Sequence, residues 1–348
     1  MDWYRNSYRD LPWRKRRDPY AIWISEVMLQ QTQVKTVLRY YSKFLNAFPD
    51  VWSLSQAKSQ AVLKVWEGLG YYARARNLHA AAKQVMEEHS GKIPSDRNGF
   101  SRLPGVGKYI SAAVLSIAFN HPLAVVDGNV KRVLSRLFRI NTPVNSGSCA
   151  SVFEHHATRL LDEGNPGIFN QAVMELGALI CKPKKPDCAK CPLIRCCRAF
   201  NDRKTADYPK RIVKQRIPVY SVVFGIIVKD RKFLITRRRP DGFLGGLWEF
   251  PGGKILENES PQAACLREVK EEVDLEVKIE RNLARIRHAY THFKIEADVF
   301  ICRYLSGRVK RRSAEDHRWI ALNKIDEYPF PGANRKFIPM LKSVLSES

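Results

Sequence analysis

The first 200 residues carry apolar side chains at helical spacing. From about Tyr20 to Phe200, apolar positions recur every three or four residues, as they do on the buried face of a helix. Pro and Gly interrupt this pattern at short intervals, so it predicts several short helices joined by turns. One such run is Ile22, Val27, Val34, Leu38 and Tyr41, and the interruptions fall at Phe48-Pro49, 68–70, 91–94 and Pro104-Gly105.

After Pro218, β-branched residues and alternation replace the helical spacing. Segments of this kind are typical of strands. A helix is also predicted to begin at Ser260-Pro261, because a hydroxyl caps the first turn and Pro suits the first helical position. The predicted strands cover 219–228, 232–238 and 293–305, with a turn at Lys229-Asp230 between the first two.

Between the two patterns lies a basic segment with few apolar residues, 201–217, which we interpret as a linker. The chain is therefore predicted to be multidomain, with an all-α domain over 1–200 and an α+β domain over 218–348. No apolar run is long enough to cross a membrane, and the N-terminus lacks the apolar core of a signal peptide. We expect no membrane partner and no export.

The chain is strongly basic, with a formal net charge of +24 over 348 residues. Residues 1–200 hold 29 basic and 15 acidic side chains, so the excess lies mainly in the predicted helical domain. Nucleic acid is the partner that such an excess favours, because neutralising phosphates releases counterions. On charge alone, a basic protein without that partner stays the alternative.

Five of the eight cysteines fall between 181 and 197. Without an export signal, such a cluster indicates metal ligands and not disulfides. Four thiolates can ligate one [4Fe–4S] cluster, whereas zinc ribbons usually offer two Cys-x2-Cys pairs and only one is present. The spacing therefore favours iron–sulfur over a structural zinc. The predicted ligands are Cys181, Cys188, Cys191 and Cys197, and Cys196 is the spare thiol.

The stretch LPGVGKYISAAVL, 103–115, predicts a glycine hairpin that opens a helix. Gly105 and Gly107 allow a tight turn and a close approach to the backbone. The helix that begins near Lys108 directs its free amides over that turn, which suits a DNA phosphate. An ordinary connection between helices is the alternative.

Two carboxylates stand out in apolar surroundings. Glu26 lies in WISEVMLQQTQV, and Asp127 follows an apolar run at a predicted helix start. Cleavage of an N-glycosidic bond requires a proton on the leaving base and a negative charge near the sugar cation, roles that two carboxylates can divide. The alternatives are an exposed helix residue for Glu26 and a helix N-cap for Asp127.

These stretches resemble the MutY adenine DNA glycosylases, which belong to the helix-hairpin-helix glycosylases and are related to endonuclease III. The resemblance extends over most of residues 10–200, and the C-terminal part resembles that family's Nudix-like domain. It is carried by LPW…PY, IWISEVMLQQTQV, GLGYYARARNLHAAAK, LPGVGKYISAAVLS, VVDGNVKRVLSR, FNQAVMELGALIC and the cysteine spacing.

The resemblance implies a fold and an activity. The fold is an all-α helix-hairpin-helix glycosylase domain with an iron–sulfur cluster loop at 181–197, joined to an α+β Nudix-like domain. The activity is hydrolysis of the bond that holds adenine mispaired with 8-oxoguanine, or with guanine, in duplex DNA, after the adenine is flipped out of the stack. This reaction starts base excision repair.

Roles for individual residues are implied in the same way. Glu26 protonates adenine N7 and later activates water, while Asp127 stabilises the sugar cation or bonds to it transiently. Tyr109 and Asn129 support the two carboxylates through hydrogen bonds. The positions of Gln31 and Tyr71 match residues that probe the base stack beside 8-oxoguanine, although simple packing is the alternative for Tyr71.

Endonuclease III is the nearest alternative within the wider family. Its hairpin helix carries a lysine whose amine forms a Schiff base, but here Tyr109 takes that place after Lys108. A covalent lyase route is therefore not expected, although the Lys108 amine lies one residue away. A bifunctional glycosylase/lyase acting on pyrimidine lesions stays the alternative function, and a non-catalytic DNA-binding protein is a further one.

The C-terminal domain of the family reads 8-oxoguanine through a short loop, usually with Phe, Ser and His. Tyr290, Thr291 and His292 stand at those positions here, so an aromatic ring and a hydroxyl are kept. The alternative is an ordinary strand end.

A nearly complete Nudix box runs from Gly253 to Asp274, which replaces a late Gly. On a helix, Glu268, Glu271 and Glu272 share one face and suit Mg²⁺ held partly by substrate phosphates. Hydrolysis of oxidised nucleotides by this domain is thus a further alternative, and a solvated acidic helix is the simpler reading. We also expect a monomer that acts on double-stranded DNA in a bacterial cytoplasm.

Overall fold

The structure is a computed structural model that describes residues 1–213 and 217–346. Residues 214–216, part of the predicted linker, lie outside this range. The chain divides into two compact units. The helical unit comprises Met1–Gln56 and Asn77–Lys214, and the sheet unit comprises Ala57–Arg76 and Gln215–Ser348. The expected boundaries at 200 and 217 stay a prediction.

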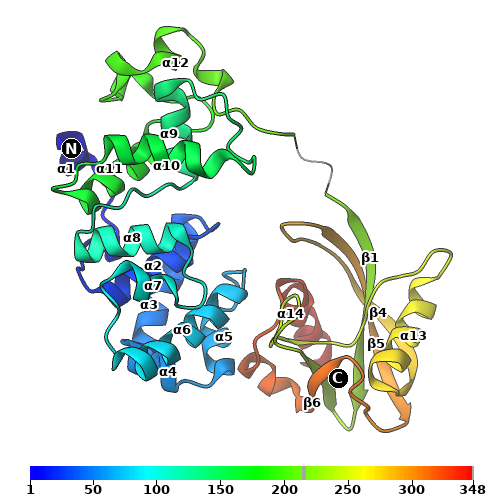
Figure 1. Cartoon of the computed structure of the whole chain (residues 1–348). Coiled ribbons are helices and arrows are strands. Elements are labelled where there is room, and N and C mark those ends of the chain that lie inside the picture. The colour runs from blue at the N-terminus through cyan, green and yellow to red at the C-terminus, as the bar shows by residue number, and fades with distance from the viewer. Residues whose placement is uncertain (214–216, 347–348) are drawn as a thin grey trace. The chain divides into compact units, whose positions relative to one another are not determined.

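Helices account for most of the described N-terminal residues (Figure 1). The α-helices are α1 Asp2–Ser7, α2 Pro19–Leu29, α3 Val34–Ala47, α4 Val51–Gln56, α5 Ser59–Trp66, α6 Ala73–His89, α7 Arg97–Ser101, α8 Lys108–Phe119, α9 Gly128–Phe138, α10 Cys149–Leu160, α11 Pro166–Leu179, α12 Arg198–Asn201, α13 Pro261–Val273 and α14 Gly332–Ser346. The 3₁₀ turns are η1 Pro12–Arg14, η2 Cys188–Lys190, η3 Ile194–Cys196, η4 Thr205–Asp207 and η5 Leu322–Glu327.

The helical unit is organised around α2, which is buried over most of its length. Asp18 caps this helix by accepting from the amides of Tyr20 and Ala21, and α2 then packs against α8. The α9 helix packs in turn against α11. Because α11 also packs against α8, the two pairs are joined, and the N-terminal turn of α8, the start of α9 and the C-terminal part of α2 lie in one region.

Six strands form the sheet of the second unit: β1 Val219–Lys229, β2 Lys232–Arg238, β3 Trp248–Glu249, β4 Glu276–Ala289, β5 Lys294–Ser306 and β6 Ala314–Ala321. Their order is β3-β2-β1-β5-β4, and β6 pairs with β2. The β1–β5 pair is parallel, while β1–β2, β2–β3, β2–β6 and β4–β5 are antiparallel. The three strands and the helix predicted from the sequence are confirmed.

Helices α13 and α14 cover opposite faces of this sheet (Figure 1). Alternate residues of β1 explain the arrangement, because neighbouring side chains on a strand point to opposite faces. Ile226 packs with the α14 residues Phe337 and Leu341 in one core, while Ile227 packs with Cys265 and Val269 of α13 in the other.

The contact between α9 and α11 depends on Gly177, which has no side chain. A Cβ at Gly177 in α11 would lie 2.6 Å from Asn129 Cβ and 3.0 Å from its carbonyl oxygen, closer than packed atoms approach. No larger residue fits there unless the helices move apart. Since Asn129 is the second residue of α9, this contact also sets the position of the start of that helix.

Gly177→Ala is expected to destabilise the helical unit. Overpacking typically costs about 1–3 kcal/mol, and the better helix propensity of Ala returns only about 1 kcal/mol. Urea unfolding followed by circular dichroism measures the net loss. Gly147→Ala is the matched control, because a Cβ there has nothing within 4 Å. Equal stability of the two variants would contradict the assigned contact.

Candidate functional site

Glu26 and Asp127 line the same cavity of the helical unit, which has a volume of about 470 Å³. Glu26 comes from the last turns of α2, and Asp127 is the residue that precedes α9. Tyr109 and Asn129 line the cavity as well. The four residues expected to form the catalytic group therefore meet, although up to 103 positions separate them in the chain.

Glu26 is buried, with 4% of its surface exposed, so its interpretation as an exposed helix residue is wrong. The Tyr109 hydroxyl donates to Glu26 Oε2 at 2.7 Å. Burial raises the pKa of Glu26 to about 7, since the hydrogen bond from Tyr109 lowers it less and the charge of Asp127 raises it further. A carboxyl with that pKa can hold a proton near neutral pH and release it.

Asp127 is the N-cap of α9, as one sequence interpretation holds. Its Oδ1 accepts from the Val130 amide at 2.6 Å, and its Oδ2 accepts from Asn129 Nδ2 at 2.8 Å. Burial raises the pKa of Asp127, and these hydrogen bonds oppose that shift. The Asp127 carboxylate caps α9 and also lines the cavity. The two roles are compatible, because the positive end of the helix dipole favours a negative charge at this position.

One buried arginine joins this cavity to the cysteine loop. Arg132, in the second turn of α9, donates to Asn129 Oδ1 at 2.9 Å and to the Cys181 carbonyl at 2.7 Å. It also donates to the Gly177 carbonyl at 2.7 Å. Hydrogen bonds thus run without a break from Asp127 through Asn129 and Arg132 to the first cysteine of the cluster.

Sequence reasoning missed two cavity residues, Arg14 and Glu175. Glu175 accepts from Arg14 at 2.6 Å and from Arg9 at 2.7 Å. Burial works to raise the pKa of Glu175, but these hydrogen bonds outweigh it and lower the pKa to about 2. The basic run at 14–17 and a Glu within an apolar helix were the available signals.

The four predicted ligand cysteines line one small cavity of about 30 Å³. The side chain of the spare Cys196 is exposed, and its thiol donates to the Leu193 carbonyl. Arg136 donates to Cys181 Sγ at 3.2 Å and to the Lys182 carbonyl at 2.8 Å, which holds the loop in place. Ile180, Pro186, Ile194 and Phe200 supply apolar walls.

Within residues 1–213 and 217–346, no three His, Cys, Asp or Glu side chains converge as they would on one metal ion. The four thiols and the apolar walls of their cavity are the kind of donor set that a [4Fe–4S] cluster takes.

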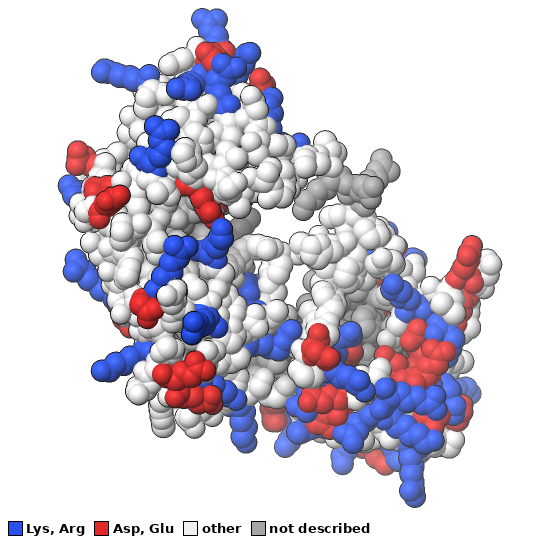
Figure 2. Space-filling model, viewed as in Figure 1, with Lys and Arg blue, Asp and Glu red and all other residues white. Residues whose placement is uncertain are grey.

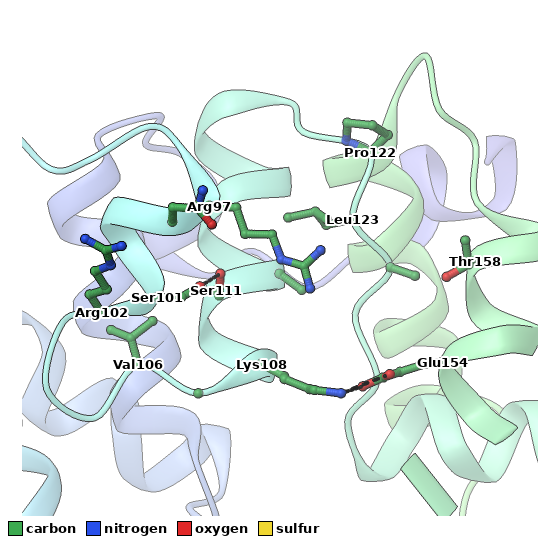
Figure 3. A pocket seen from close by; sticks show the side chains of 14 residues that line it. Arg97, Ser101, Arg102, Val106, Lys108, Ser111, Pro122, Leu123, Glu154 and Thr158 are labelled. Carbon is green, nitrogen blue, oxygen red and sulfur yellow. Dashed lines mark hydrogen bonds and ion pairs between the residues drawn. The ribbon is translucent and has the colours of Figure 1, made fainter. Parts of the chain in front are cut away.

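The glycine hairpin precedes α8 as predicted. Gly105 has φ +77, a left-handed conformation that favours glycine, and Gly107 is the N-cap of α8. A Cβ at Gly107 would meet nothing within 4 Å, so its backbone is open to an external group. The hairpin borders a cavity of about 740 Å³ with several basic and hydroxyl side chains (Figure 3).

Lys108 lines this second cavity and is absent from the lining of the carboxylate cavity. Its ammonium lies 3.2 Å from Glu154 on α10 (Figure 3). Arg97 and Arg102 also line the cavity. The side of the hairpin that bears Lys108 is therefore a basic, polar surface, as contact with a phosphate backbone requires.

Gln31 and Tyr71, the two residues expected to probe the base stack, have the same uncommon backbone conformation. Gln31 has φ 55 and Tyr71 has φ 50, a left-handed region that residues other than glycine rarely adopt. Both side chains are exposed. Such conformations persist where the surroundings impose them and often mark functional sites.

In the sheet unit, Tyr71 meets the loop that was predicted to read 8-oxoguanine. The Tyr71 hydroxyl lies 2.7 Å from Thr291 Oγ1. Tyr71, Tyr290, Thr291 and His292 line one cavity of about 460 Å³ together with Phe243. The rings of Phe243 and Tyr290 lie 5.3 Å apart at 81°.

The three Glu side chains of the Nudix box are partly engaged by other groups of the protein, so they are only partly available to bind Mg²⁺. Arg267 forms ion pairs with Glu268 at 2.9 Å and Glu271 at 3.1 Å, while Glu272 accepts from the Gly252 amide at 3.0 Å. Burial raises the pKa of Glu272 to about 7. The expectation of Mg²⁺ at these three residues stays a prediction.

Basic side chains are spread over both units, and on the sheet unit Asp and Glu lie among them (Figure 2).

No helix in the described part of the chain is long and apolar enough to span a membrane.

Comparison with protein families first gives the class of protein that this chain resembles. Residues 24–147 match the HhH-GPD superfamily of base excision DNA repair proteins, and residues 222–340 match the NUDIX domain. A thermostable thymine-DNA glycosylase aligns with a TM-score of 0.54 and 32% identity over 58% of this chain and 93% of that one. Endonuclease III bound non-covalently to DNA aligns with a TM-score of 0.50 at 24% identity, over 58% and 92%, which supports the fold alone.

Whole-chain relatives narrow the class to a family. The adenine DNA glycosylase of Buchnera aphidicola subsp. Schizaphis graminum is 30% identical over 98% of this chain and 97% of its own length. That of Arabidopsis thaliana is 33% identical, but the chain spans 57% of its length, and that of Rattus norvegicus is 34% identical, with 69% spanned. The chain belongs to the adenine DNA glycosylase family, and the predicted fold class is confirmed.

Arg132→Gln is expected to weaken the cysteine loop. The change leaves buried acceptors on Asn129, Gly177 and Cys181 without a donor, and each such loss costs about 1–3 kcal/mol. We expect lower iron content per chain and a lower unfolding temperature.

Arg139→Gln is the matched control, because Arg139 stands at the exposed end of the same helix in a surface ion pair with Asp202. Normal iron content and stability in Arg132→Gln would contradict the structural link.

Proposed function

We propose that this protein hydrolyses the N-glycosidic bond of adenine opposite 8-oxoguanine in double-stranded DNA. The observation that carries the proposal is the shared cavity in which Glu26, with a pKa raised to about 7, faces Asp127 at the N-terminus of α9. The family supports adenine as the leaving base, and the cavity of the sheet unit around Tyr290 supports recognition of the opposite base.

Glu26 acts first as a general acid. It donates its proton to adenine N7, so the C1′–N9 bond breaks with its electron pair on the neutral leaving base. Tyr109 holds the carboxyl by its 2.7 Å hydrogen bond, and burial raises the pKa of Glu26 to about 7, so a substantial share of the protein carries the acid form near neutral pH.

Asp127 opposes the positive charge that develops on the sugar. Its two oxygens are held by Val130 and Asn129, so the carboxylate is oriented before the reaction. Water then attacks C1′ and gives a proton to the Glu26 carboxylate, which leaves an abasic sugar and restores the acid.

The position of the Schiff-base lysine carries no amine here, although the side chain of Lys35, at the start of α3, is among those that line this cavity. Tyr109 occupies the position of the Schiff-base lysine of endonuclease III, and Lys108 lies in the other cavity beside Glu154. The reaction therefore ends at the abasic site, and the strand stays intact until alkali or another enzyme cleaves it.

Cys181, Cys188, Cys191 and Cys197 would hold a [4Fe–4S] cluster in the helical unit. When bound, it cross-links four thiolates of a segment that has only short 3₁₀ turns of its own. Arg132 and Arg136 carry this order into α9, and the basic side chains beside the cysteines are available to phosphates. A monomeric state and a bacterial cytoplasmic location stay predictions.

Glu26→Gln is expected to reduce single-turnover base release by about a hundredfold or more, the usual contribution of a general acid. Binding to the duplex should be retained, because the substitution keeps the shape of the side chain. Glu163→Gln changes an exposed Glu and is the control. Full activity of Glu26→Gln would refute the assignment.

The wild-type rate should also depend on pH. The acid form of Glu26 is required and its pKa is about 7. The rate should be constant below pH 7 and fall by about tenfold per unit above it, as the proton is lost. A rate that rises through this interval would mean that an ionised group starts the reaction.

Tyr290→Ala and His292→Ala are each expected to reduce the rate ratio for adenine opposite 8-oxoguanine over adenine opposite guanine by about tenfold, or ~1.4 kcal/mol. Single-turnover cleavage of both duplexes, with alkali added after quenching, measures the ratio. Tyr304→Ala, a Tyr of the same unit outside the cavity lining, is the control. An unchanged ratio in both variants would exclude this loop as the reader of the opposite base.

A further inference from the structure

The segment that carries Tyr71 is hydrogen-bonded to the rest of the sheet unit at two points away from the cavity. The first is Gln60 in α5. Its Nε2 donates to the Gly246 carbonyl at 2.9 Å, and its Oε1 accepts from Trp248 Nε1 at 2.8 Å. Trp248 is 1% exposed, so its indole N–H has no access to water and depends on Gln60.

The second point is Glu67, directly after α5. Its side chain is 5% exposed and accepts from the Phe330 amide and the Lys64 ammonium, both at 2.8 Å. The guanidinium of Arg335 in α14 donates to the same carboxylate. Lys64 also donates to the Tyr328 carbonyl at 2.9 Å. A nearly buried carboxylate with three donors makes strong, charge-assisted contacts.

Between these points and the cavity the chain makes one tight turn. Tyr71 follows Glu67 by four residues, has φ 50, and places its hydroxyl 2.7 Å from Thr291. Trp66 and Arg74 each donate to the Gly70 carbonyl at 3.1 Å, which gives the turn its shape. The contacts of Gln60 and Glu67 give it its place on the sheet unit.

We propose that Gln60 and Glu67 form a latch that sets the position of Tyr71 against Thr291 and thereby tunes discrimination of the base opposite adenine. This inference rests on the proposed reading of 8-oxoguanine at the Tyr290–His292 loop. Neither latch residue lines the cavity, so both are positioning residues that act through Tyr71.

The latch maintains the distances and angles between the groups on the two sides of the cavity, on which a base-reading site depends. Discrimination by hydrogen bonds is lost when the groups on the two sides of a cavity shift, because each bond depends on distance and angle. Tyr71 and Thr291 are 220 residues apart and share one direct hydrogen bond. The contacts at Gln60 and Glu67 keep that pair in register while DNA occupies the cavity.

Glu67→Gln and Gln60→Leu test the latch in the full-length, iron-loaded protein. Each should reduce the rate ratio for adenine opposite 8-oxoguanine over adenine opposite guanine by about tenfold, or ~1.4 kcal/mol. The rate for adenine opposite guanine should stay within about twofold, because Glu26 and Asp127 lie in the other unit. Asp326→Ala is the matched control, since Asp326 pairs with Lys342 on the surface of the sheet unit.

Hydrogen exchange of the DNA-free protein gives a readout independent of activity. The latch predicts faster amide exchange at 68–72 and 291–293 in both variants, and no change in Asp326→Ala. If Glu67→Gln fails to fold, Arg335→Gln removes the same ion pair from its exposed side.

Wild-type ratios for both duplexes and wild-type exchange at both segments in the variants would overturn the latch. A wild-type protein that shows no preference for 8-oxoguanine would instead overturn the proposed reading of the lesion, and the exchange data would still decide the latch.

Discussion

Burial of the Glu26 carboxyl next to Asp127 is the constraint on which the helical unit depends. A carboxyl group has a pKa near neutral where burial outweighs the hydrogen bonds and positive charges that favour its ionised form. The packing of α2 against α8 provides that environment, with Tyr109 as a neutral partner. The strong ion pairs of the cavity are directed to Glu175 instead, where Arg9 and Arg14 hold a permanently ionised group.

The α9 helix transmits this arrangement to the rest of the unit. Its first turn orients Asp127, its second turn places Arg132 against Cys181, and its third places Arg136 against the cysteine loop. The absence of a side chain at Gly177 lets α11 lie against the same stretch. Short hydrogen bonds thus join the cysteine loop to the carboxylate of Asp127 at the start of the helix.

In the sheet unit, segments that are distant in the chain likewise pack together around one cavity. Aromatic rings from different strands and loops surround it, and Tyr71 is brought to it by a segment from the N-terminal part of the chain. In the proposed latch, recognition of the base opposite adenine also depends on two residues that do not line the cavity, Gln60 and Glu67. The Nudix-type helix α13 supports the opposite face of the sheet, and Arg267 neutralises two of its acids.

The sequence by itself determined the local features of this protein. Short-range patterns identified three of the six strands of the sheet unit, the cap at Asp127, the hairpin at Gly105 and the four cysteines that line one cavity. Each of these depends on neighbours in the chain, so spacing and residue type were sufficient. The resemblance of whole motifs supplied the pairing of Glu26 with Asp127, which spacing could not.

Only the tertiary structure decided what depends on contacts between distant segments. The burial of Glu26, the place of Arg14 and Glu175 in its cavity, and the separation of Lys108 from that cavity follow from helix packing. The grouping of residues 57–76 with the sheet unit has the same origin. The pKa of a buried acid and the partner of a buried amide are properties of the surrounding fold, and no periodicity along the chain encodes which segments supply those surroundings.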